Sequence, residues 1–333
     1  MRAGGAWVPA VTAVLLLFLG PSSSLADAAG ATASWDDSDA RRHDPISGRG
    51  SPAIEVPLRI AHGWFVVPVL LDDSVSLEFI VDTGAGMSAV TRSTLERLGR
   101  ATAASVRAKG ASGAQELPLA RLGSLSLPGL RAFNPSVLVL DDRVLTPRVP
   151  GNPDPYDGVL GADLLAEYDV LLDPIAGVLR LFSPGEAAQD ALPRLAEAIP
   201  LWRIAGPILG HDVQINGSVM PAILDTGSRR VVVSPRAARN ARVQALPGTA
   251  QSGQAGVGTR EVTWEDVDLE RVRAGTTELG SMAAQVGALP IFHSLGFADR
   301  AVVLLGNPAL RGCPVLISYE RDTVRYCESP QGS

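Results

Sequence analysis

The sequence contains an internal repeat, and this repeat constrains the fold more than any other feature. An apolar stretch that runs into Asp-Thr-Gly and then a small residue occurs at 77–85 and again at 220–228. A second block, in which apolar residues precede a glycine, occurs at 158–161 and again at 303–306. The first block returns after 143 residues and the second after 145, in the same order. One shared tripeptide is common, but agreement in order, spacing and flanks predicts two similar structural units.

The repeat also sets the expected domain boundaries. We expect a first lobe over residues 54–183 and a second over 200–328, joined by a linker at 184–199. The linker holds either one short helix within 187–198 or no regular structure. Residues 27–53 are rich in Asp, Ala, Ser, Gly and Arg without an apolar period, so we interpret them as a flexible leader.

Composition favours strands over helices in both units. Hydrophobic residues make up 46% of the chain and aromatic residues only 5%, while Val, Leu, Gly and Pro are plentiful. We therefore expect a mostly β fold with few short helices. One helix is expected at 92–98, ending at Gly99, and a shorter counterpart at 235–239, ending at Asn240. Pro308 is expected to distort the helix that follows the second apolar-glycine block.

The N-terminus has the features of a secretory signal. Arg2 supplies a positive start, 11–19 is an apolar run, and 24–26 offers the small residues that a signal peptidase reads. We expect a signal peptide over 1–26 and an exported protein, periplasmic or secreted, with no membrane attachment after cleavage. The alternative is an uncleaved anchor, although the apolar run, even counted back past Pro9, is short for a membrane span.

Export makes the two cysteines informative. Cys313 and Cys327 stand at the ends of a hairpin pattern, in which two apolar runs flank the polar turn 320–322. A disulfide bond between them fits an oxidising compartment, and two free buried thiols are the alternative. The four histidines stand far apart, so we expect no metal site and no cofactor. The net charge of −6 and the scattered arginines argue against a nucleic-acid partner.

The residues that follow each repeated aspartate favour a tight, braced loop. Gly84 and Gly227 let the backbone turn sharply where a side chain would clash. Thr83 and Thr226 carry hydroxyls that can hold one loop against the other. A single Asp-Thr-Gly is an ordinary turn sequence, but two copies on related halves can form one site.

The two aspartates themselves point to acid–base chemistry. A two-fold arrangement brings Asp82 and Asp225 face to face, and two carboxylates at hydrogen-bonding distance cannot both ionise cheaply. They titrate as a pair that shares one proton, which supplies a base and an acid together. The carboxylate takes a proton from a trapped water that attacks a peptide carbonyl, and its protonated partner donates to the carbonyl oxygen.

The pattern resembles the retropepsin and pepsin type of aspartic peptidase, in the bacterial two-lobed form whose lobes are both retropepsin-like. The resemblance covers nearly all of the chain after residue 54 and rests on the repeated Asp-Thr-Gly loops and the later apolar-glycine turns. It implies two β-barrel lobes with a cleft between them, and Asp82 and Asp225 as the catalytic pair. It also implies a peptide or protein substrate. Because one chain carries both lobes, we expect a monomer.

The resemblance further implies a flap, a glycine-bearing hairpin that closes over the substrate. The candidates are 109–113 in the first lobe and 251–258 in the second, although both could be ordinary surface hairpins. No aromatic residue lies between Phe79 and Phe133, so the flap tyrosine of pepsin-like enzymes is absent and the retropepsin form fits better. The candidate flap residues are Gly110, Ser112, Gly113 and Gly256.

The second loop departs from the first in its flank. Arg229 and Arg230 follow it directly, and they either line the cleft and favour acidic side chains or face outward, which we favour. Ser228 supports its loop and can donate a hydrogen bond to a carboxylate, whereas its counterpart Ala85 cannot. We therefore expect Asp225 to be the readier of the pair to carry the charge.

Three functions compete at this point. The first is an acid endopeptidase acting outside the cytoplasm. The second is a binding module that keeps the cleft and does not cut, and the third is a structural envelope protein with incidental motifs. Both Asp-Thr-Gly copies are intact, which favours catalysis, and the third reading explains neither the repeat nor its spacing.

Overall fold

A computed structural model describes residues 18–19, 54–147, 154–185 and 194–328. The predicted signal peptide and leader lie outside these residues, except for the two residues of strand β1 (Phe18–Leu19). In the part of the chain that is described, no helix has both the length and the apolar character needed to cross a bilayer.

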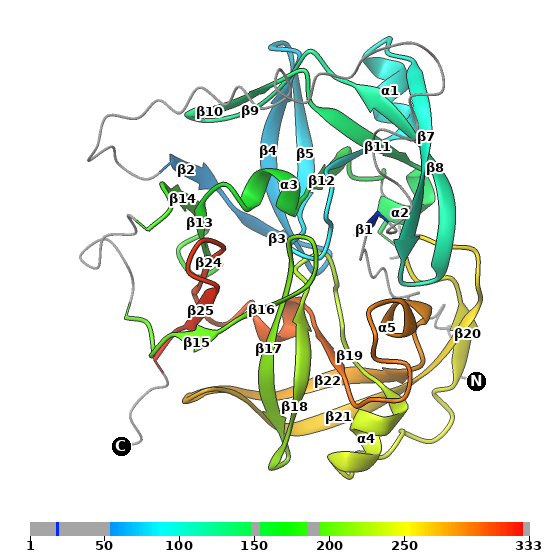
Figure 1. The fold of residues 1–333 in the computed structure, drawn as a ribbon, viewed down its shortest axis with the longest axis vertical. Coiled ribbons are helices and arrows are strands. Elements are labelled where there is room, and N and C mark those ends of the chain that lie inside the picture. Colours follow the sequence, from blue (N-terminus) through cyan, green and yellow to red (C-terminus); the bar gives the residue numbers. More distant parts are fainter. Residues whose placement is uncertain (1–17, 20–53, 148–153, 186–193, 329–333) are drawn as a thin grey trace, which may run out of the picture.

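The first half of the chain builds an 11-stranded sheet (Figure 1). Its strands are β1, β3 (Arg59–Ala61), β4 (Trp64–Leu71), β5 (Val75–Val81), β6 (Ala89–Thr91), β7 (Thr102–Gly110), β8 (Gly113–Arg121), β9 (Ser124–Leu127), β10 (Leu130–Phe133), β11 (Ser136–Leu140) and β12 (Gly158–Leu160). Two short helices accompany it, α1 (Arg92–Arg97) and α2 (Asp142–Leu145). Strand β7 lies between β8 and β1.

The second half repeats this arrangement in an eight-stranded sheet, which an extra pairing of β17 with β21 helps to close. Its strands are β16 (Trp202–Ala205), β17 (Ile208–Ile215), β18 (Ser218–Leu224), β19 (Val231–Val233), β20 (Gln251–Gly253), β21 (Val262–Ala274), β22 (Thr277–Gly287) and β23 (Val303–Leu305). Its helices are α4 (Pro235–Asn240) and α5 (Pro290–Ser294). The two halves stack one above the other in Figure 1.

A third sheet of six strands joins the halves. The first half supplies β2 (Ile54–Pro57), β13 (Asp169–Asp173) and β14 (Val178–Phe182), and the second supplies β15 (Ile199–Pro200), β24 (Val315–Ser318) and β25 (Thr323–Tyr326). At its centre β13 pairs antiparallel with β24. The largest cluster of buried apolar side chains contains residues of all three sheets, so one continuous core runs through the molecule.

The prediction of a mostly β fold with short helices is confirmed. The predicted first helix is α1, whose N-cap Thr91 accepts a hydrogen bond from the amide of Thr94. The prediction of a shorter second helix is wrong, because α4 has six residues, as α1 has. Ser234 caps α4 and Pro235 occupies its first turn, a combination that favours a full helix start.

Two further helix expectations have different outcomes. The helix α3 (Ala162–Leu165) follows the first apolar-glycine block, whereas the second block leads into a 3-10 turn, η3 (Asn307–Ala309). This distortion was predicted from Pro308. In the linker, residues 194–198 form no helix, and the rest of the stretch that was considered for one lies outside the described residues.

The predicted disulfide bond between Cys313 and Cys327 is present. It closes the β24–β25 hairpin, whose strands pair from Val315 opposite Tyr326 to Ser318 opposite Thr323. The first half has the corresponding hairpin, β13–β14, without a disulfide. The cross-link therefore marks one of several differences between the halves.

Candidate active site

The two aspartates stand at the ends of equivalent strands. Strand β5 runs parallel to β12, and β18 runs parallel to β23 in the same register. The amide of Asp82 donates to the carbonyl of Leu160 at 3.0 Å, and the amide of Asp225 donates to that of Leu305 at 3.2 Å. The repeated apolar-glycine blocks thus form the strands β12 and β23, which pair with the strands before the aspartates and accept hydrogen bonds from the aspartate amides.

The loops hold each other through their threonines. The hydroxyl of Thr83 donates to the carbonyl of Leu224 at 3.1 Å and accepts from the amide of Thr226 at 3.2 Å. The hydroxyl of Thr226 donates to the carbonyl of Val81 at 2.8 Å and accepts from the amide of Thr83 at 3.0 Å. These four buried bonds fix the two halves relative to each other at the aspartates.

The two carboxyl groups are held in the same way. The amide of Gly84 donates to Oδ1 of Asp82 at 2.8 Å, and the amide of Gly227 donates to Oδ1 of Asp225 at 2.9 Å. Both aspartates are 0% exposed. Their Oδ2 atoms have no hydrogen-bond partner among the described residues. Each carboxyl therefore has one fixed oxygen and one oxygen available for chemistry.

Burial dominates the electrostatics of this pair. It raises the pKa of Asp225 to about 7. It raises the pKa of Asp82 well above its usual value, and the negative charge of Asp225 raises it further. With both pKa values raised, the pair favours a state that keeps a proton.

Comparison of the sequence with known proteins identifies the family of this chain. A family model described as aspartyl protease matches residues 67–164 and 211–309, one match in each half. The chain belongs to the aspartyl protease family. No curated protein matches its sequence. Among solved structures it is similar to basic 7S globulin from soybean, at 13% identity and a TM-score of 0.43, over 83% of this chain and 94% of that chain. A likeness at that TM-score bears on neither fold nor function.

Glycine is required at one point of the aspartyl protease loops. A Cβ atom on Gly227 would lie 2.1 Å from Oδ2 of Asp82, far inside contact distance. The second loop thus approaches the first carboxyl so closely that only a hydrogen fits between them.

The structure does not bear out the reason given for a charge on Asp225. The hydroxyl of Ser228 donates to the carbonyl of Arg230 at 2.8 Å rather than to a carboxylate. Ser228 instead supports its own loop, because its hydroxyl also accepts from the amide of Arg230 at 3.3 Å. The expectation that Asp225 carries the charge stays a prediction.

Arg229 does not face outward. Its guanidinium carbon lies 4.4 Å from the ring centroid of Trp64, which belongs to the other half, and the side chain is half-buried. The indole of Trp64 donates to the carbonyl of Gly227 at 2.8 Å, and Asn307 donates to the carbonyl of Gly63 at 3.0 Å. Sequence reasoning missed Trp64, because nothing local marks a partner 163 residues away.

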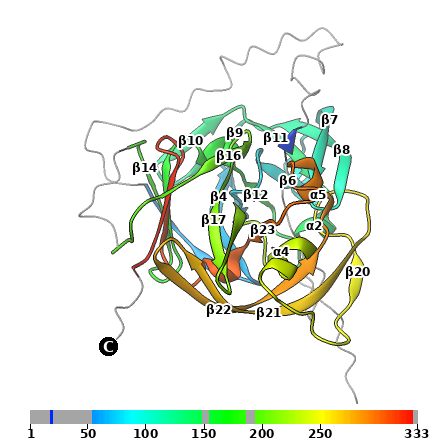
Figure 2. The same ribbon diagram turned by 60° about the horizontal axis from the view of Figure 1, so that its bottom comes forward.

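The candidate flaps meet each other. The β7–β8 hairpin, which ends with Gly110 opposite Gly113, reaches toward the loop between β20 and β21 (Figures 1 and 2). The hydroxyl of Ser112 accepts from the amide of Ala255 at 2.7 Å and donates to its carbonyl at 3.2 Å. The amide of Ser112 donates to the carbonyl of Val257 at 2.9 Å.

A side chain of each tip also packs against the opposite half. Ala111 belongs to an apolar cluster of the second half, together with Ile223. Val257 belongs to a cluster of the first half, together with Trp64 and Ala85. Gly256, the fourth candidate flap residue, has a positive φ of 66° in the loop between these contacts. Each tip therefore lies over the aspartate loop region of the opposite half.

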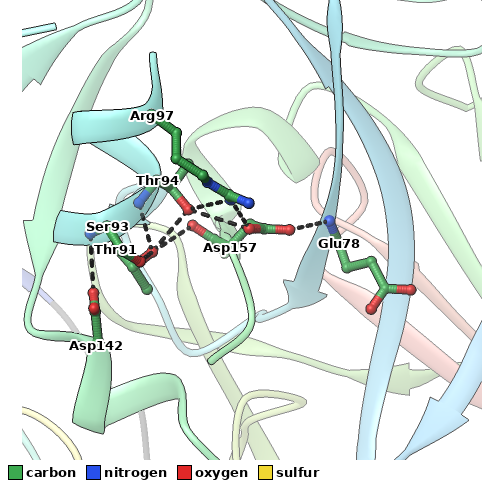
Figure 3. Close-up of polar contacts among 7 residues, drawn as sticks. All are labelled: Glu78, Thr91, Ser93, Thr94, Arg97, Asp142 and Asp157. Atoms are coloured by element: carbon green, nitrogen blue, oxygen red, sulfur yellow. Dashed lines mark hydrogen bonds and ion pairs between the residues drawn. The ribbon is translucent and has the colours of Figure 1, made fainter. Parts of the chain in front are cut away.

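A hollow of about 610 Å³ is lined by residues of the first half. On its wall, Oδ2 of Asp157 accepts from the amide of Glu78 at 2.8 Å, and Oδ1 accepts from the hydroxyl of Thr94 at 3.2 Å and pairs with Arg97 (Figure 3). Asp157 thus links α1 to β5, which is a structural role. Neither aspartate of the pair lines this hollow.

The described residues contain no group of three or more His, Cys, Asp or Glu side chains that is placed to hold a metal ion. The chemistry that they offer is that of two buried carboxyl groups.

Proposed function

We propose that the protein is an aspartic endopeptidase that hydrolyses peptide bonds with a water activated by Asp82 and Asp225. The observation that carries the proposal is the matched pair of buried carboxyls, each with one oxygen fixed by a glycine amide and one without a described partner. Membership of the aspartyl protease family supports the reaction class.

The pKa directions suggest a division of roles. Asp225, whose pKa burial raises to about 7, is the base that takes a proton from the water. Asp82, whose pKa burial and the charge of Asp225 raise further, is the acid that donates to the carbonyl oxygen. The proton of the water then passes to the leaving amine through the pair.

The finer features of the enzyme belong to the same proposal. The substrate is a peptide or protein, and the tips at 110–113 and 254–260 act as two flaps that open to admit it. The enzyme is exported and works as a monomer in the periplasm or the medium. The disulfide bond fits this location, because such bonds persist in oxidising compartments.

Cleavage of an unfolded protein from about pH 3 to pH 9 tests the proposal, because the base must be ionised and burial raises the pKa of Asp225 to about 7. The chain without residues 1–26 is compared with Asp82→Asn and Asp225→Asn. Each substitution is expected to lower kcat/KM by on the order of a thousandfold or more, because the two carboxyls act as a unit.

Asp163→Asn is the matched control. Asp163 is exposed, and its carboxylate accepts from the hydroxyl of Ser88 at 2.7 Å outside the pair. This variant is expected to cut if it folds. A folded parent that cuts nothing, yet binds a peptide-like inhibitor of aspartic proteases, would favour the alternative of a module that binds without cutting.

A further inference from the structure

The peptide unit between Gly227 and Ser228 lies against both aspartates. At its Gly227 end, an added Cβ would be 2.1 Å from Oδ2 of Asp82. Its amide, which belongs to Ser228, donates to the backbone carbonyl of Asp225 at 3.3 Å. Because a peptide unit is planar, a contact that fixes its carbonyl oxygen also fixes the direction of its amide.

A residue of the other half holds the carbonyl of this unit. The indole Nε1 of Trp64 donates to the carbonyl of Gly227 at 2.8 Å, and the bond is buried. The ring of Tyr156 stands nearly perpendicular to the indole, at 88° with centroids 5.6 Å apart. The guanidinium carbon of Arg229 lies 4.4 Å from the centroid of the indole ring. Packing therefore sets the indole N–H in place before any ligand binds.

The first aspartate loop has an aliphatic side chain in the equivalent place. Val66 and Gly210 each pair with the residue two before an aspartate, so β4 and β17 occupy the same place in the two halves. Two residues before them stand Trp64 and Ile208. Ile208 is fully buried, and its side chain has no N–H to donate. An indole donor thus serves the second loop where the first has none at this position.

A donor on the carbonyl side of the peptide unit acts on the carboxyl at its amide side. Hydrogen bonds in series polarise one another, so the bond to the carbonyl of Gly227 makes the amide of Ser228 a stronger donor. Burial raises the pKa of Asp225 to about 7, while its interaction with Asp82 and the amides of its own loop oppose that rise. The stronger the Ser228 amide is as a donor, the more it favours the charged form of Asp225.

We infer that Trp64 is a positioning residue, which aims the Ser228 amide at Asp225 and so favours Asp225 as the charged member of the pair. This inference rests on the proposed function and gives a physical cause for the role of Asp225 as the base. The other charged and titratable groups near this unit come from several elements: Asp82, Arg229, Tyr156 and, from the joining sheet, Tyr319. A change that removes only the indole N–H leaves all of them in the chain.

Trp64→Phe makes that change, because it removes the N–H and keeps an aromatic ring. In the cleavage assay from about pH 3 to pH 9, the ascending limb of kcat/KM is expected to move up by about 0.7 pH unit. Well below the midpoint, kcat/KM is then about fivefold lower than in the parent, and on the plateau it changes by less than about twofold. Thermal unfolding checks that the variant folds.

Trp264→Phe is the matched control. Trp264 is also buried, and its indole donates to the side chain of Gln251 at 3.3 Å rather than to an aspartate loop. This variant is expected to keep the midpoint of the parent. An equal loss at every pH in Trp64→Phe would indicate a structural role only. That result would overturn the inference and leave the peptidase function intact.

A spectroscopic measurement needs neither cleavage nor a substitution at Trp64. Without residues 1–26 the chain has four indole N–H groups, those of Trp35, Trp64, Trp202 and Trp264, and ¹⁵N NMR follows each of them against pH. The Trp64 resonance is expected to move with a midpoint near pH 7, the pKa of Asp225, and the Trp264 resonance to stay constant.

The two aspartate variants show which carboxyl moves the resonance. The movement of the Trp64 resonance is expected to persist in Asp82→Asn, where Asp225 titrates alone, and to disappear in Asp225→Asn. His62, which bonds to Tyr156, is present in both variants. A constant Trp64 resonance, or a movement that survives Asp225→Asn, would overturn the inference. If the parent never cuts, the peptidase function fails, and this titration still decides the inference.

Discussion

The two halves match closely at the aspartate loops and differ a few residues away. Thr83 and Thr226 make the same bonds in opposite directions, and the glycines after them hold the carboxyls alike. Beside them, the first loop continues with small residues and the second with arginines. Symmetry persists where the two loops bind each other directly, since each bond has a two-fold counterpart. It is lost beside them, where Arg229 packs on Trp64 of the other half and the residue at the place of Arg229 in the first loop is Gly86.

The largest effect is expected from breaking the close approach of the loops. Gly227→Ala would place a methyl group 2.1 Å from the Asp82 carboxyl, so the loop must move. A displacement of this size at reacting groups is expected to lower kcat/KM by roughly a hundredfold or more. The cleavage assay measures this.

Gly312→Ala serves as the control, because an added Cβ there meets nothing within 4 Å. Full activity in Gly227→Ala would mean that the second loop does not approach Asp82 as described.

The second prediction concerns how the stability of the fold depends on pH through Asp82 and Asp225. Both carboxyls have a pKa raised above the unfolded value of about 4, so the folded state is favoured at low pH. That contribution is lost as the pH rises through about 7, the pKa of Asp225, and through the raised pKa of Asp82. Asp82→Asn removes a group that must take up a proton to fold at this pH, so this variant is expected to unfold at a higher temperature than the parent at pH 8.

At pH 4 the advantage of Asp82→Asn is expected to disappear, since the parent pair is then protonated. Thermal unfolding of the two proteins at both pH values decides this. An identical difference at pH 4 and pH 8 would contradict mutual titration of the pair.

Substitutions of Thr83 and Thr226 test whether the two loops contribute equally to the free energy of unfolding. Thr83→Val and Thr226→Val each leave a buried amide and a buried carbonyl without a partner, at an expected cost of about 2–4 kcal/mol in the free energy of unfolding. The two costs are expected to agree, and the double variant to cost less than their sum, because both act on one clamp. Urea unfolding measures all three.

Thr83→Ser and Thr226→Ser keep the hydroxyls and serve as controls. Costs that differ by several-fold between the two valine variants would show that the clamp is one-sided.

The smallest effect is expected at the tips. Ser112→Ala removes both bonds to the backbone of Ala255, and Ala255 is itself the residue that corresponds to Ser112. Loss of these two hydrogen bonds, together worth about 1 kcal/mol, is expected to raise the rate of hydrogen exchange at the Ala255 amide by roughly fivefold. Ser252→Ala, which removes a contact with Thr263 on the exposed face, is the control. Unchanged exchange at Ala255 would indicate that the backbone bonds alone keep the tips together.

Much of the fold follows from the sequence because it repeats at a fixed interval. The mostly β character, the placement of α1, the distortion at Pro308 and the cysteine hairpin all rest on local patterns, and the structure agrees with them. The aspartate loops were found for the same reason. The length of α4 was misjudged, since the cap at Ser234 and the proline after it were not weighed.

Contacts between distant residues could not be predicted in this way. Trp64 over Gly227, Ser112 at Ala255 and Arg229 across the boundary depend on how two separate sheets come together. Only the periodicity within each half is visible in one sequence. The direction of Arg229 was misjudged because an arginine after a turn usually points to solvent, whereas here an aromatic ring of the other half lies within reach.

The six-stranded sheet has a consequence for the separated halves. Strands β13 and β24 pair at its centre, with Asp169 opposite Ser318 and Leu172 opposite Val315. Cutting the chain in the linker would expose the edge of each strand, a row of unpaired backbone groups beside a buried apolar face. A free first half would then offer β13 to a second copy of itself. Two identical halves joined edge to edge would reproduce the central pairing of this sheet without a covalent linker.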